Sequence, residues 1–369
     1  MQELRAEQVR LIEHHGRKEL SIVRLLGLGR SQLARTNSMM RIMIRSLTNP
    51  VATSRTEVHP NRTRLIQDIL DLKHEKNVVL LAHYYQSPGI QELADHVGDS
   101  LALARAAERT DAPIILFCGV HFMAKTAKIL NPTRKVLVPD LHAGCSLAES
   151  APVAKFRAFV DAHPHHVVVS YINCSAEVKA MSDIICTSSN AVRVVNSIPT
   201  QHEIIFAPDK HLGAYIQRIT GRKMLLWDGV CEVHVEISAD KLELLLEKYP
   251  EAKLIAHPEC PEHLLTMADH VGSTSSLLDF VERDTGTTFI VATEAGILHK
   301  MRQAVPYKRL IAAPVHADNA CACSECPYMK LNTLEKVHAA LLNEEPEIVL
   351  NEDIRHRAYR ALRNMLDLG

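Results

Sequence analysis

The sequence predicts an α/β fold of three pseudo-symmetric α/β/α units, with short parallel sheets around one central cavity. Three observations lead to this prediction. Short apolar runs alternate with helical stretches, the runs fall into three similar sets, and each set leads to a cysteine. Apolar runs without polar alternation indicate strands that are covered on both faces, which is typical of parallel sheets.

The composition is that of an ordinary globular protein and excludes several function classes. Of the 369 residues, 47% are hydrophobic and 23% are charged, and the formal net charge is -1. The balanced charge and the 4% aromatic content argue against a nucleic-acid surface, which needs basic patches and stacking platforms. No apolar run reaches the roughly 18 residues that a membrane span needs. We therefore expect neither a nucleic acid nor a membrane as a partner.

The first segment, residues 1–61, is predicted to be a poorly ordered N-terminal extension. Between Glu19 and Glu57 there are six Arg and five Ser but no acidic residue. This is the composition of a transit peptide, although a frayed extension or a wrongly included upstream start explains it as well. We expect a cytoplasmic protein, with organelle import as the lesser alternative.

The folded body is divided into units over residues 62–150, 151–238 and 239–369, the last including C-terminal helices. Short β-branched runs predict nine strands, which begin at Asn77, Ile114, Lys135, Val167, Glu203, Met224, Lys253, Phe289 and Arg309. Helical stretches, such as the one from Ser100 to Arg109, lie between them.

Each set of three strands repeats the same features in the same order. The first strand ends in a polar tripeptide that begins at His83, Tyr171 or His257, so the spacings are 88 and 86 residues. Small hydroxylated residues then open a helix at Gly98-Asp99-Ser100, Thr187-Ser188-Ser189 and Ser273-Thr274-Ser275. Ligands of open α/β sheets bind beyond the carboxyl ends of the strands. Three such ends around a pseudo-threefold axis therefore converge on one cavity.

The third strand of each set leads to a cysteine, which suggests a shared metal centre. These are Cys145 and Cys231, followed in the third unit by one of Cys321, Cys323 and Cys326. The long spacings do not fit a local zinc site, whereas thiolates suit iron–sulfur clusters. A four-iron cluster on three thiolates leaves one iron open as a Lewis acid.

Other cysteine chemistry stays open at this stage. Cys323 and Cys326 also form a Cys-x-x-Cys pair, which can close a disulfide or hold zinc. The remaining cysteines are expected to be small buried apolar residues: Cys118, Cys174, Cys186 and Cys260.

Side chains for binding and proton transfer lie at the same predicted face. Ser100, Ser188 and Thr274 at helix starts suit the phosphate or carboxylates of a small polyanionic substrate, although each alone is an ordinary N-cap. The acid–base candidates are His83, Tyr85, Tyr171, His257 and Glu259. Three other histidines are expected to be structural: His121, His142 and His263.

These residues resemble the quinolinate synthase family, the iron–sulfur enzymes of de novo NAD biosynthesis. The resemblance covers about residues 62–369 and rests on stretches such as Leu81-Ala-His-Tyr-Tyr-Gln, Trp227-Asp-Gly-Val-Cys-Glu-Val-His and Ala256-His-Pro-Glu-Cys-Pro. It implies that iminoaspartate condenses with dihydroxyacetone phosphate to quinolinate, with release of phosphate and two waters (an EC 2.5.1 transferase). It also implies a [4Fe-4S] cluster, by position on Cys145, Cys231 and Cys326.

The resemblance also implies roles for individual residues. The substrate-contacting positions are matched by His83, Ser100, Tyr171, Asn173, Ser188, His257, Glu259 and Thr274. Tyr85 matches a tyrosine that closes over the site, and the implied catalytic residues are Tyr85, Tyr171, His257 and Glu259. The chain departs from the family at Lys125, where an acidic residue is expected. A transient encounter with an aspartate-oxidising enzyme is also compatible with the resemblance.

Three alternative interpretations remain. The first is an iron–sulfur dehydratase acting on another small diacid, and the second is a non-catalytic cluster-bearing redox sensor. The third is an α/β protein stapled by zinc.

Overall fold

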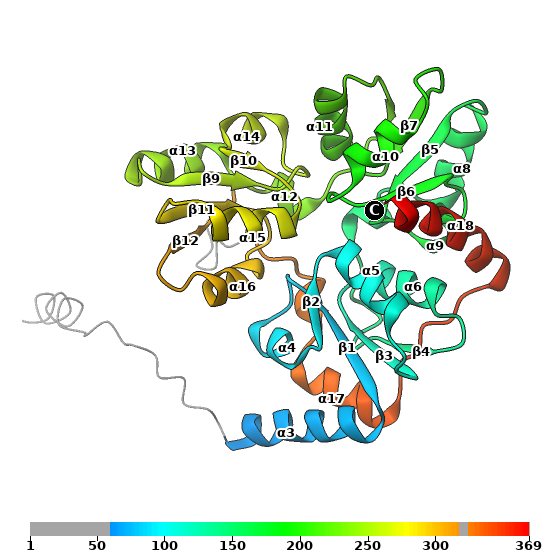
Figure 1. Cartoon of the computed structure of the whole chain (residues 1–369), viewed down its shortest axis with the longest axis vertical. Coiled ribbons are helices and arrows are strands. Elements are labelled where there is room, and N and C mark those ends of the chain that lie inside the picture. The colour runs from blue at the N-terminus through cyan, green and yellow to red at the C-terminus, as the bar shows by residue number, and fades with distance from the viewer. Residues whose placement is uncertain (1–59, 317–323, 369) are drawn as a thin grey trace, which may run out of the picture. The chain divides into compact units, whose positions relative to one another are not determined.

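The computed structural model describes residues 60–316 and 324–368 (Figure 1). The chain divides into two parts, Met1–His59 and Pro60–Gly369, and only the second is described here. Nearly all of the predicted extension therefore lies outside the described residues, as do Cys321 and Cys323.

Within residues 60–316 and 324–368, twelve strands form three separate four-stranded sheets, and every pairing between these strands is parallel. The first sheet has the order β2-β1-β3-β4 and contains β1 (Val78–His83), β2 (His96–Gly98), β3 (Ile114–Cys118) and β4 (Lys135–Leu137). The second has the order β6-β5-β7-β8, with β5 (Val167–Tyr171), β6 (Ile184–Cys186), β7 (Ile204–Ala207) and β8 (Leu225–Leu226). The third has the order β10-β9-β11-β12, with β9 (Lys253–Ala256), β10 (His270–Val271), β11 (Thr288–Ala292) and β12 (Arg309–Ala312). The prediction of an α/β fold with three repeated units is confirmed.

Helices lie between the strands of each sheet and cover them. The first unit contains α3 (Pro60–Glu75), α4 (Pro88–Leu93), α5 (Ser100–Arg109) and α6 (His121–Leu130). Next along the chain are α7 (Ser146–Glu149), α8 (Val153–Asp161), α9 (Ala176–Lys179), α10 (Ala191–Ser197), α11 (Lys210–Thr220) and α12 (Glu232–Val235). The third sheet is accompanied by α13 (Ala239–Lys248), α14 (Glu262–Met267), α15 (Thr274–Arg283) and α16 (Ile297–Ala304).

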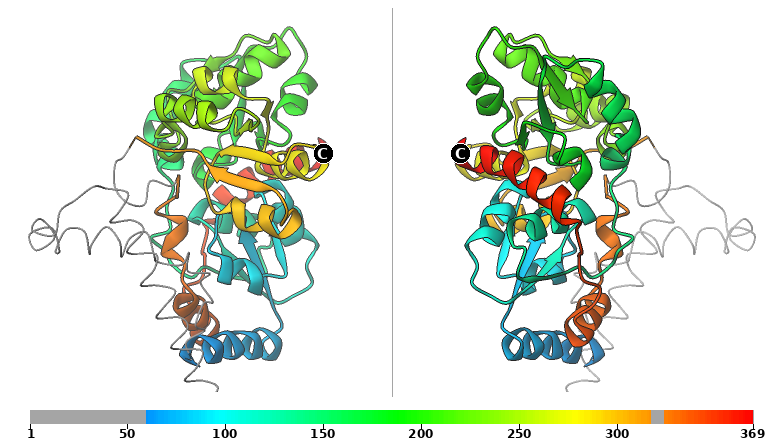
Figure 2. Two further views of the ribbon diagram at one scale, coloured as in Figure 1. Left: turned by 90° about the vertical axis from the view of Figure 1, so that its left-hand side faces the viewer. Right: turned by 90° about the vertical axis from the view of Figure 1, so that its right-hand side faces the viewer.

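The C-terminal segment leaves the third sheet and packs on the other two. A short 3-10 helix (Met329–Leu331) is followed by α17 (Leu334–Asn343) and α18 (Glu352–Leu368). Helix α17 packs against α3, as Figure 2 shows, and α18 packs against β6 and α9. The three sheets fall within the ranges predicted for the units, but the exact unit boundaries stay a prediction. No helix among the residues described is both long and apolar enough to cross a membrane.

Each sheet contains one strand more than the sequence predicted, so the expectation of three strands per unit was wrong. The extra strands are β2, β6 and β10, which have only three, three and two residues and lie at a sheet edge. Two of them carry little apolar signal in the sequence, since β2 reads His96-Val97-Gly98 and β10 reads His270-Val271. They form because the neighbouring central strand offers a ladder of backbone groups to pair with.

The repeat extends to individual hydrogen bonds. In each unit an aspartate just before the short edge strand accepts the backbone N–H of a residue in the first strand. The pairs are Asp95 with Leu80 (2.7 Å), Asp183 with Val168 (2.8 Å) and Asp269 with Leu254 (2.8 Å). Their spacing is the same 88 and 86 residues as that of the polar tripeptides.

The two inner strands of each sheet are buried on both faces, as expected for parallel sheets covered by helices. In β1, Val79 and Leu81 belong to one apolar cluster, while Val78, Leu80 and Ala82 belong to another. Successive side chains of a strand point to opposite faces, so the two clusters lie on the two sides of the sheet.

Candidate functional site

One cavity is lined by residues at or beyond the carboxyl ends of strands from all three sheets. The residues predicted from the sequence as site residues all line it: His83, Tyr85, Ser100, Cys145, Tyr171, Asn173, Ser188, Cys231, His257, Glu259, Thr274 and Cys326. His83 and Tyr171 end β1 and β5, and His257 follows β9 directly. The parallel topology therefore brings the polar ends of the first strands together.

At two of the three predicted helix starts, the hydroxyl-bearing residue is the first residue of a helix. Ser100 and Thr274 are the first residues of α5 and α15. In the second unit the expectation was wrong, because Ser188 lies in a turn and α10 begins later, at Ala191. The cause is Asn190, whose Oδ1 accepts the backbone N–H of Thr187 at 2.7 Å and folds the segment into a turn before the helix.

Glu259 is the centre of a buried group of acid–base side chains. The Tyr171 hydroxyl donates to Glu259 Oε1 at 2.6 Å. His257 Nδ1 lies 3.6 Å from the same oxygen, and His234 Nδ1 lies 3.2 Å from Glu259 Oε2. The two imidazole rings stack with centroids 4.9 Å apart. The Tyr171 hydroxyl thus donates to one carboxylate oxygen, and an imidazole nitrogen lies near each of the two oxygens.

These contacts set the protonation states of the group. Burial acts to raise the pKa of Glu259, but the charge of His234 and hydrogen bonds from His234 and Tyr171 outweigh it and lower the pKa to about 2. Burial lowers the pKa of His257 to about 3 and that of His83 to about 4, since it disfavours the cation. At neutral pH the site therefore holds the Glu259 carboxylate together with neutral His257 and His83.

The tyrosines of the site stay protonated. Burial raises the pKa of Tyr85 and of Tyr171 well above the ordinary value. The Tyr85 hydroxyl lies 3.1 Å from Thr274 Oγ1 and 2.8 Å from Thr293 Oγ1. Both phenols can therefore donate hydrogen bonds to a carboxylate.

The predicted ligand cysteines and the remaining described cysteines have different surroundings. Cys145, Cys231 and Cys326 line the cavity, each contributed by a different unit. Burial raises the pKa of Cys145 to about 12 and that of Cys326 to about 11, so metal binding must release their protons. The others lie fully buried away from the cavity lining: Cys118, Cys174, Cys186 and Cys260.

The donor atoms at the cavity fit a metal group in two ways. Three thiols on one cavity are the ligand type of an iron–sulfur cluster. A second set is mixed, because ligand atoms of Cys231, His234 and Glu259 lie within 4.8 Å of one another. A cysteine–histidine–carboxylate set of this kind also suits a single zinc ion.

His234 belongs to the site and was not predicted from the sequence. It lies on α12, and its Nε2 is 3.0 Å from Thr293 Oγ1. A signal was present, because Cys231 and His234 are three residues apart and this spacing puts two side chains on one face of a helical turn. Asp99 and Glu294 also line the cavity and were not predicted as site residues.

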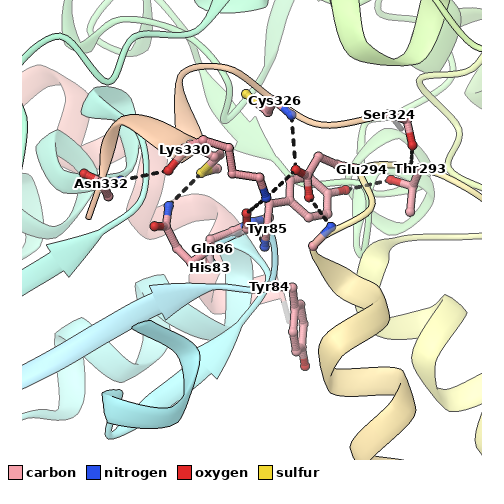
Figure 3. A network of polar contacts seen from close by, with 12 residues as sticks. His83, Tyr84, Tyr85, Gln86, Thr293, Glu294, Ser324, Cys326, Lys330 and Asn332 are labelled. Atoms are coloured by element: carbon pink, nitrogen blue, oxygen red, sulfur yellow. Dashed lines mark hydrogen bonds and ion pairs between the residues drawn. The ribbon is translucent and has the colours of Figure 1, made fainter. Parts of the chain in front are cut away.

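A network around Glu294 connects the Cys326 loop to the segment after β1 (Figure 3). Glu294 Oε1 accepts the backbone N–H of Cys326 at 3.1 Å, and Oε2 accepts that of Gly296 at 2.7 Å. Lys330 Nζ lies 2.9 Å from Glu294 Oε1 and donates to the backbone oxygen of Tyr85 at 2.8 Å. The pair therefore links a predicted cluster ligand to a predicted closing tyrosine.

Not every polar atom in the lining has a hydrogen-bond partner among the described residues. Asn173 Oδ1 is buried and makes no hydrogen bond. Buried polar groups are normally paired, so an orphan in a cavity wall suggests a place for a ligand donor. Its neighbour Tyr171 already donates to Glu259.

Four residues that the sequence analysis set apart do not line the cavity. Lys125 lies on α6, two residues beyond the lining residue Met123, and is not itself part of the lining. The histidines expected to be structural are likewise outside it: His121, His142 and His263.

Comparisons with known proteins agree over nearly the whole described part. The NadA family model, described as "Quinolinate synthetase A protein", matches residues 67–367. A protein of Trichormus variabilis named "Quinolinate synthase" is 56% identical over 305 residues, which are 83% of this chain and 94% of that protein. A "Quinolinate synthase" of Microcystis aeruginosa is 53% identical over 319 residues, covering 85% of this chain and 99% of that protein.

A solved structure gives a much weaker likeness. The E-1-hydroxy-2-methyl-but-2-enyl-4-diphosphate reductase of Plasmodium falciparum has a TM-score of 0.30 and 11% identity, covering 76% of this chain and 94% of that chain.

Proposed function

The chain belongs to the quinolinate synthase family, and from that premise we propose that it condenses iminoaspartate with dihydroxyacetone phosphate. The products are quinolinate, phosphate and two waters. The observation that carries the proposal is that every predicted site residue lines one cavity, although these residues come from three separate units.

The proposed cofactor is a [4Fe-4S] cluster held by Cys145, Cys231 and Cys326. Its support is the donor set, since each unit contributes one thiol to the same cavity. When bound through three thiolates, such a cluster supplies an iron with no protein ligand, which can act as a Lewis acid.

Hydroxyls are proposed to hold the anionic groups of the substrates, and an amide oxygen is proposed to accept a hydrogen bond from a neutral group. Ser100, Ser188 and Thr274 line the cavity from the three units, at or near helix starts where backbone N–H groups favour anions. His83 lines the same cavity and is neutral at neutral pH, so it can donate or accept a hydrogen bond. The unpaired Oδ1 of Asn173 is suited to accept a proton-bearing group, such as the imine or a hydroxyl.

Proton transfer is assigned to Glu259, with His257 and Tyr171 beside it. Glu259 is ionised at neutral pH, so it can accept a proton from a substrate carbon or nitrogen that reaches it. Tyr171 donates to one of its oxygens and is the nearest group that can hand on a proton. Tyr85 is proposed to close over the bound substrates, which would exclude water from the reactive imine.

The supply of substrate and the location form part of the same proposal. Imines hydrolyse in water, so a transient encounter with an aspartate-oxidising enzyme would shorten the exposure of iminoaspartate. The described cysteines are free, as a reducing compartment such as the cytoplasm keeps them.

The test is an anaerobic reconstitution with iron and sulfide, followed by an assay for quinolinate. We expect about four irons and four sulfides per chain, as a cubane cluster requires, and formation of quinolinate from the two substrates. An absorption spectrum that responds to a dicarboxylate analogue is also expected. Protein that carries the cluster but makes no quinolinate would instead support a dehydratase of another diacid or a redox sensor.

Metal analysis decides the remaining alternative. About one zinc per chain, without iron or sulfide, would point to the mixed set of Cys231, His234 and Glu259 as a structural site. That outcome would reject the cluster proposal.

A further inference from the structure

Asp99 connects the three units at the cavity. Its side chain is almost fully buried, with 7% exposure. Asp99 Oδ2 accepts hydrogen bonds from Ser189 Oγ at 2.7 Å and from Ser275 Oγ at 2.8 Å. Its Oδ1 accepts the backbone N–H of Ala102 at 2.9 Å and so caps α5. A single carboxylate therefore ties together segments of the first, second and third units.

The repeat shows that helix capping does not explain a carboxylate at this position. The spacing of 88 and 86 residues places Thr187 and Ser273 where the first unit has Asp99. Ser273 caps α15 with its hydroxyl, which accepts the N–H of Ser276 at 3.3 Å. A hydroxyl is thus sufficient for a cap, whereas two further donors require the second oxygen of a carboxylate.

The three units share these bonds unequally. The same spacing aligns Ser189 and Ser275 with Leu101 of the first unit, which has no hydroxyl to donate. The first unit therefore supplies the acceptor and the other two supply the donors. Burying a carboxylate is costly unless it is hydrogen-bonded, and bonds to a charged acceptor are stronger than neutral ones. The arrangement consequently holds the three segments in one geometry.

Asp99, Ser189 and Ser275 are each adjacent in the sequence to a residue whose hydroxyl group lines the cavity. Ser100 follows Asp99, Ser188 precedes Ser189, and Thr274 precedes Ser275. Neighbouring Cα atoms are about 3.8 Å apart, so fixing one residue of each pair fixes the other closely.

Two of the lining hydroxyls also contact the acid–base groups. Ser188 Oγ lies 3.2 Å from His257 Nε2, and Thr274 Oγ1 lies 3.1 Å from the Tyr85 hydroxyl. Movement of the segments that Asp99 connects would therefore change these contacts. It would also change the distances between the hydroxyl groups that line the cavity.

We propose that Asp99 is a positioning residue, which sets the separation of Ser100, Ser188 and Thr274 and thereby the affinity of the cavity for phosphate and carboxylate groups. This inference rests on the proposed function, because it assumes that these hydroxyls hold the anionic groups of the substrates.

The test compares three variants with a matched control. Asp99→Ser installs the residue type that the third unit uses at this place, so it keeps a capping hydroxyl and removes the second oxygen. Ser189→Ala and Ser275→Ala each remove one hydrogen bond to Asp99 Oδ2. Asp183→Ser is the control, since it removes an aspartate that bonds to Val168 near the amino end of β5.

Binding of inorganic phosphate to the anaerobically reconstituted protein is measured by calorimetry, together with KM and kcat for quinolinate formation. We expect Asp99→Ser to weaken phosphate binding by about tenfold, the size of one lost interaction with a charged group. It should raise KM more than it lowers kcat, while Asp183→Ser leaves both unchanged. Ser189→Ala and Ser275→Ala should each weaken phosphate binding by less than Asp99→Ser does. Neither should weaken it further in the Asp99→Ser background, because the hydrogen bond to Asp99 Oδ2 is already absent there.

Four outcomes overturn the proposal. The first is wild-type phosphate affinity in Asp99→Ser. The second is a loss of phosphate affinity in Ser189→Ala or Ser275→Ala that adds in full to the loss in Asp99→Ser. If Asp99→Ser does not fold, unchanged affinity in both serine variants overturns it. Wild-type protein that binds no phosphate also overturns it, whereas protein that binds phosphate but makes no quinolinate refutes only the proposed reaction.

Discussion

Lys330 Nζ lies 2.9 Å from Oε1 of the buried Glu294, and this ion pair joins two loops of the cavity. Glu294 accepts the backbone N–H of Cys326, and Lys330 donates to the backbone oxygen of Tyr85. Burial raises the pKa of Glu294, and the nearby ammonium of Lys330 opposes that rise. The ammonium of Lys330 thus stabilises the carboxylate form of Glu294 in a buried position that disfavours the charge.

Removing one partner of this ion pair should lower the free energy of unfolding more than removing both. Lys330→Met leaves Glu294 buried without its cation, which we expect to lower the free energy of unfolding by about 3 kcal/mol. The double variant Lys330→Met/Glu294→Gln should recover part of that loss, because the remaining side chain is neutral. Denaturant unfolding of the two single variants and the double variant measures the coupling, and strictly additive losses would contradict it.

The cysteines should divide into two classes by position. Cys145→Ser, Cys231→Ser and Cys326→Ser should each lose or damage the cluster, since each removes one of three thiolates at the cavity. The core variants Cys118→Ser, Cys174→Ser and Cys260→Ser should keep it, although they cost stability. Iron and sulfide content after reconstitution checks this, and retention of the cluster in Cys326→Ser together with its loss in Cys323→Ser would show a wrong ligand choice.

Glu259→Gln should separate cofactor binding from turnover. The amide keeps the size of the side chain but cannot accept a proton as the carboxylate does, so kcat should fall by about 100-fold or more. The iron and sulfide content should stay at the wild-type value. If the variant loses its metal, then Glu259 acts as a ligand with Cys231 and His234, as their proximity allows.

Stability of the metal-free protein should fall as the pH drops below about 6.5, the ordinary pKa of histidine. Burial lowers the pKa of His83 to about 4 in the folded state, so between these values the unfolded chain binds a proton that the folded protein does not. One such group costs about 2 kcal/mol at pH 5. Glu259 does not contribute in this range, because a carboxyl with a lowered pKa loses its stabilising effect only below its unfolded value of about 4.3.

Unfolding curves at pH 7 and pH 5 for the wild type and His83→Gln check this expectation. Glutamine does not titrate, so the variant should lose about 2 kcal/mol less than the wild type between the two pH values. Equal losses in both proteins would show that His83 is not held neutral.

The sequence by itself determined the repeat and most of the candidate cavity. The tripeptides at His83, Tyr171 and His257 carry a local signal, because each follows an apolar run and recurs at a nearly constant spacing. Parallel topology then requires the carboxyl ends of the strands to lie on one side of each sheet, so convergence on a cavity followed from general rules. The edge strands β2 and β10 gave no such signal, because each has a single apolar residue beside a histidine.

Only the tertiary structure decided which distant residues bond to one another around that cavity. Asp99 finds Ser189 and Ser275 at sequence separations of 90 and 176 residues, and Lys330 reaches Tyr85 across 245. Nothing in a single unit marks these partners, because a side chain's hydrogen-bond partner depends on how the three units pack. The physical reason is that local propensity and periodicity act over a few residues, whereas the pairing of buried polar groups is settled when packing excludes water.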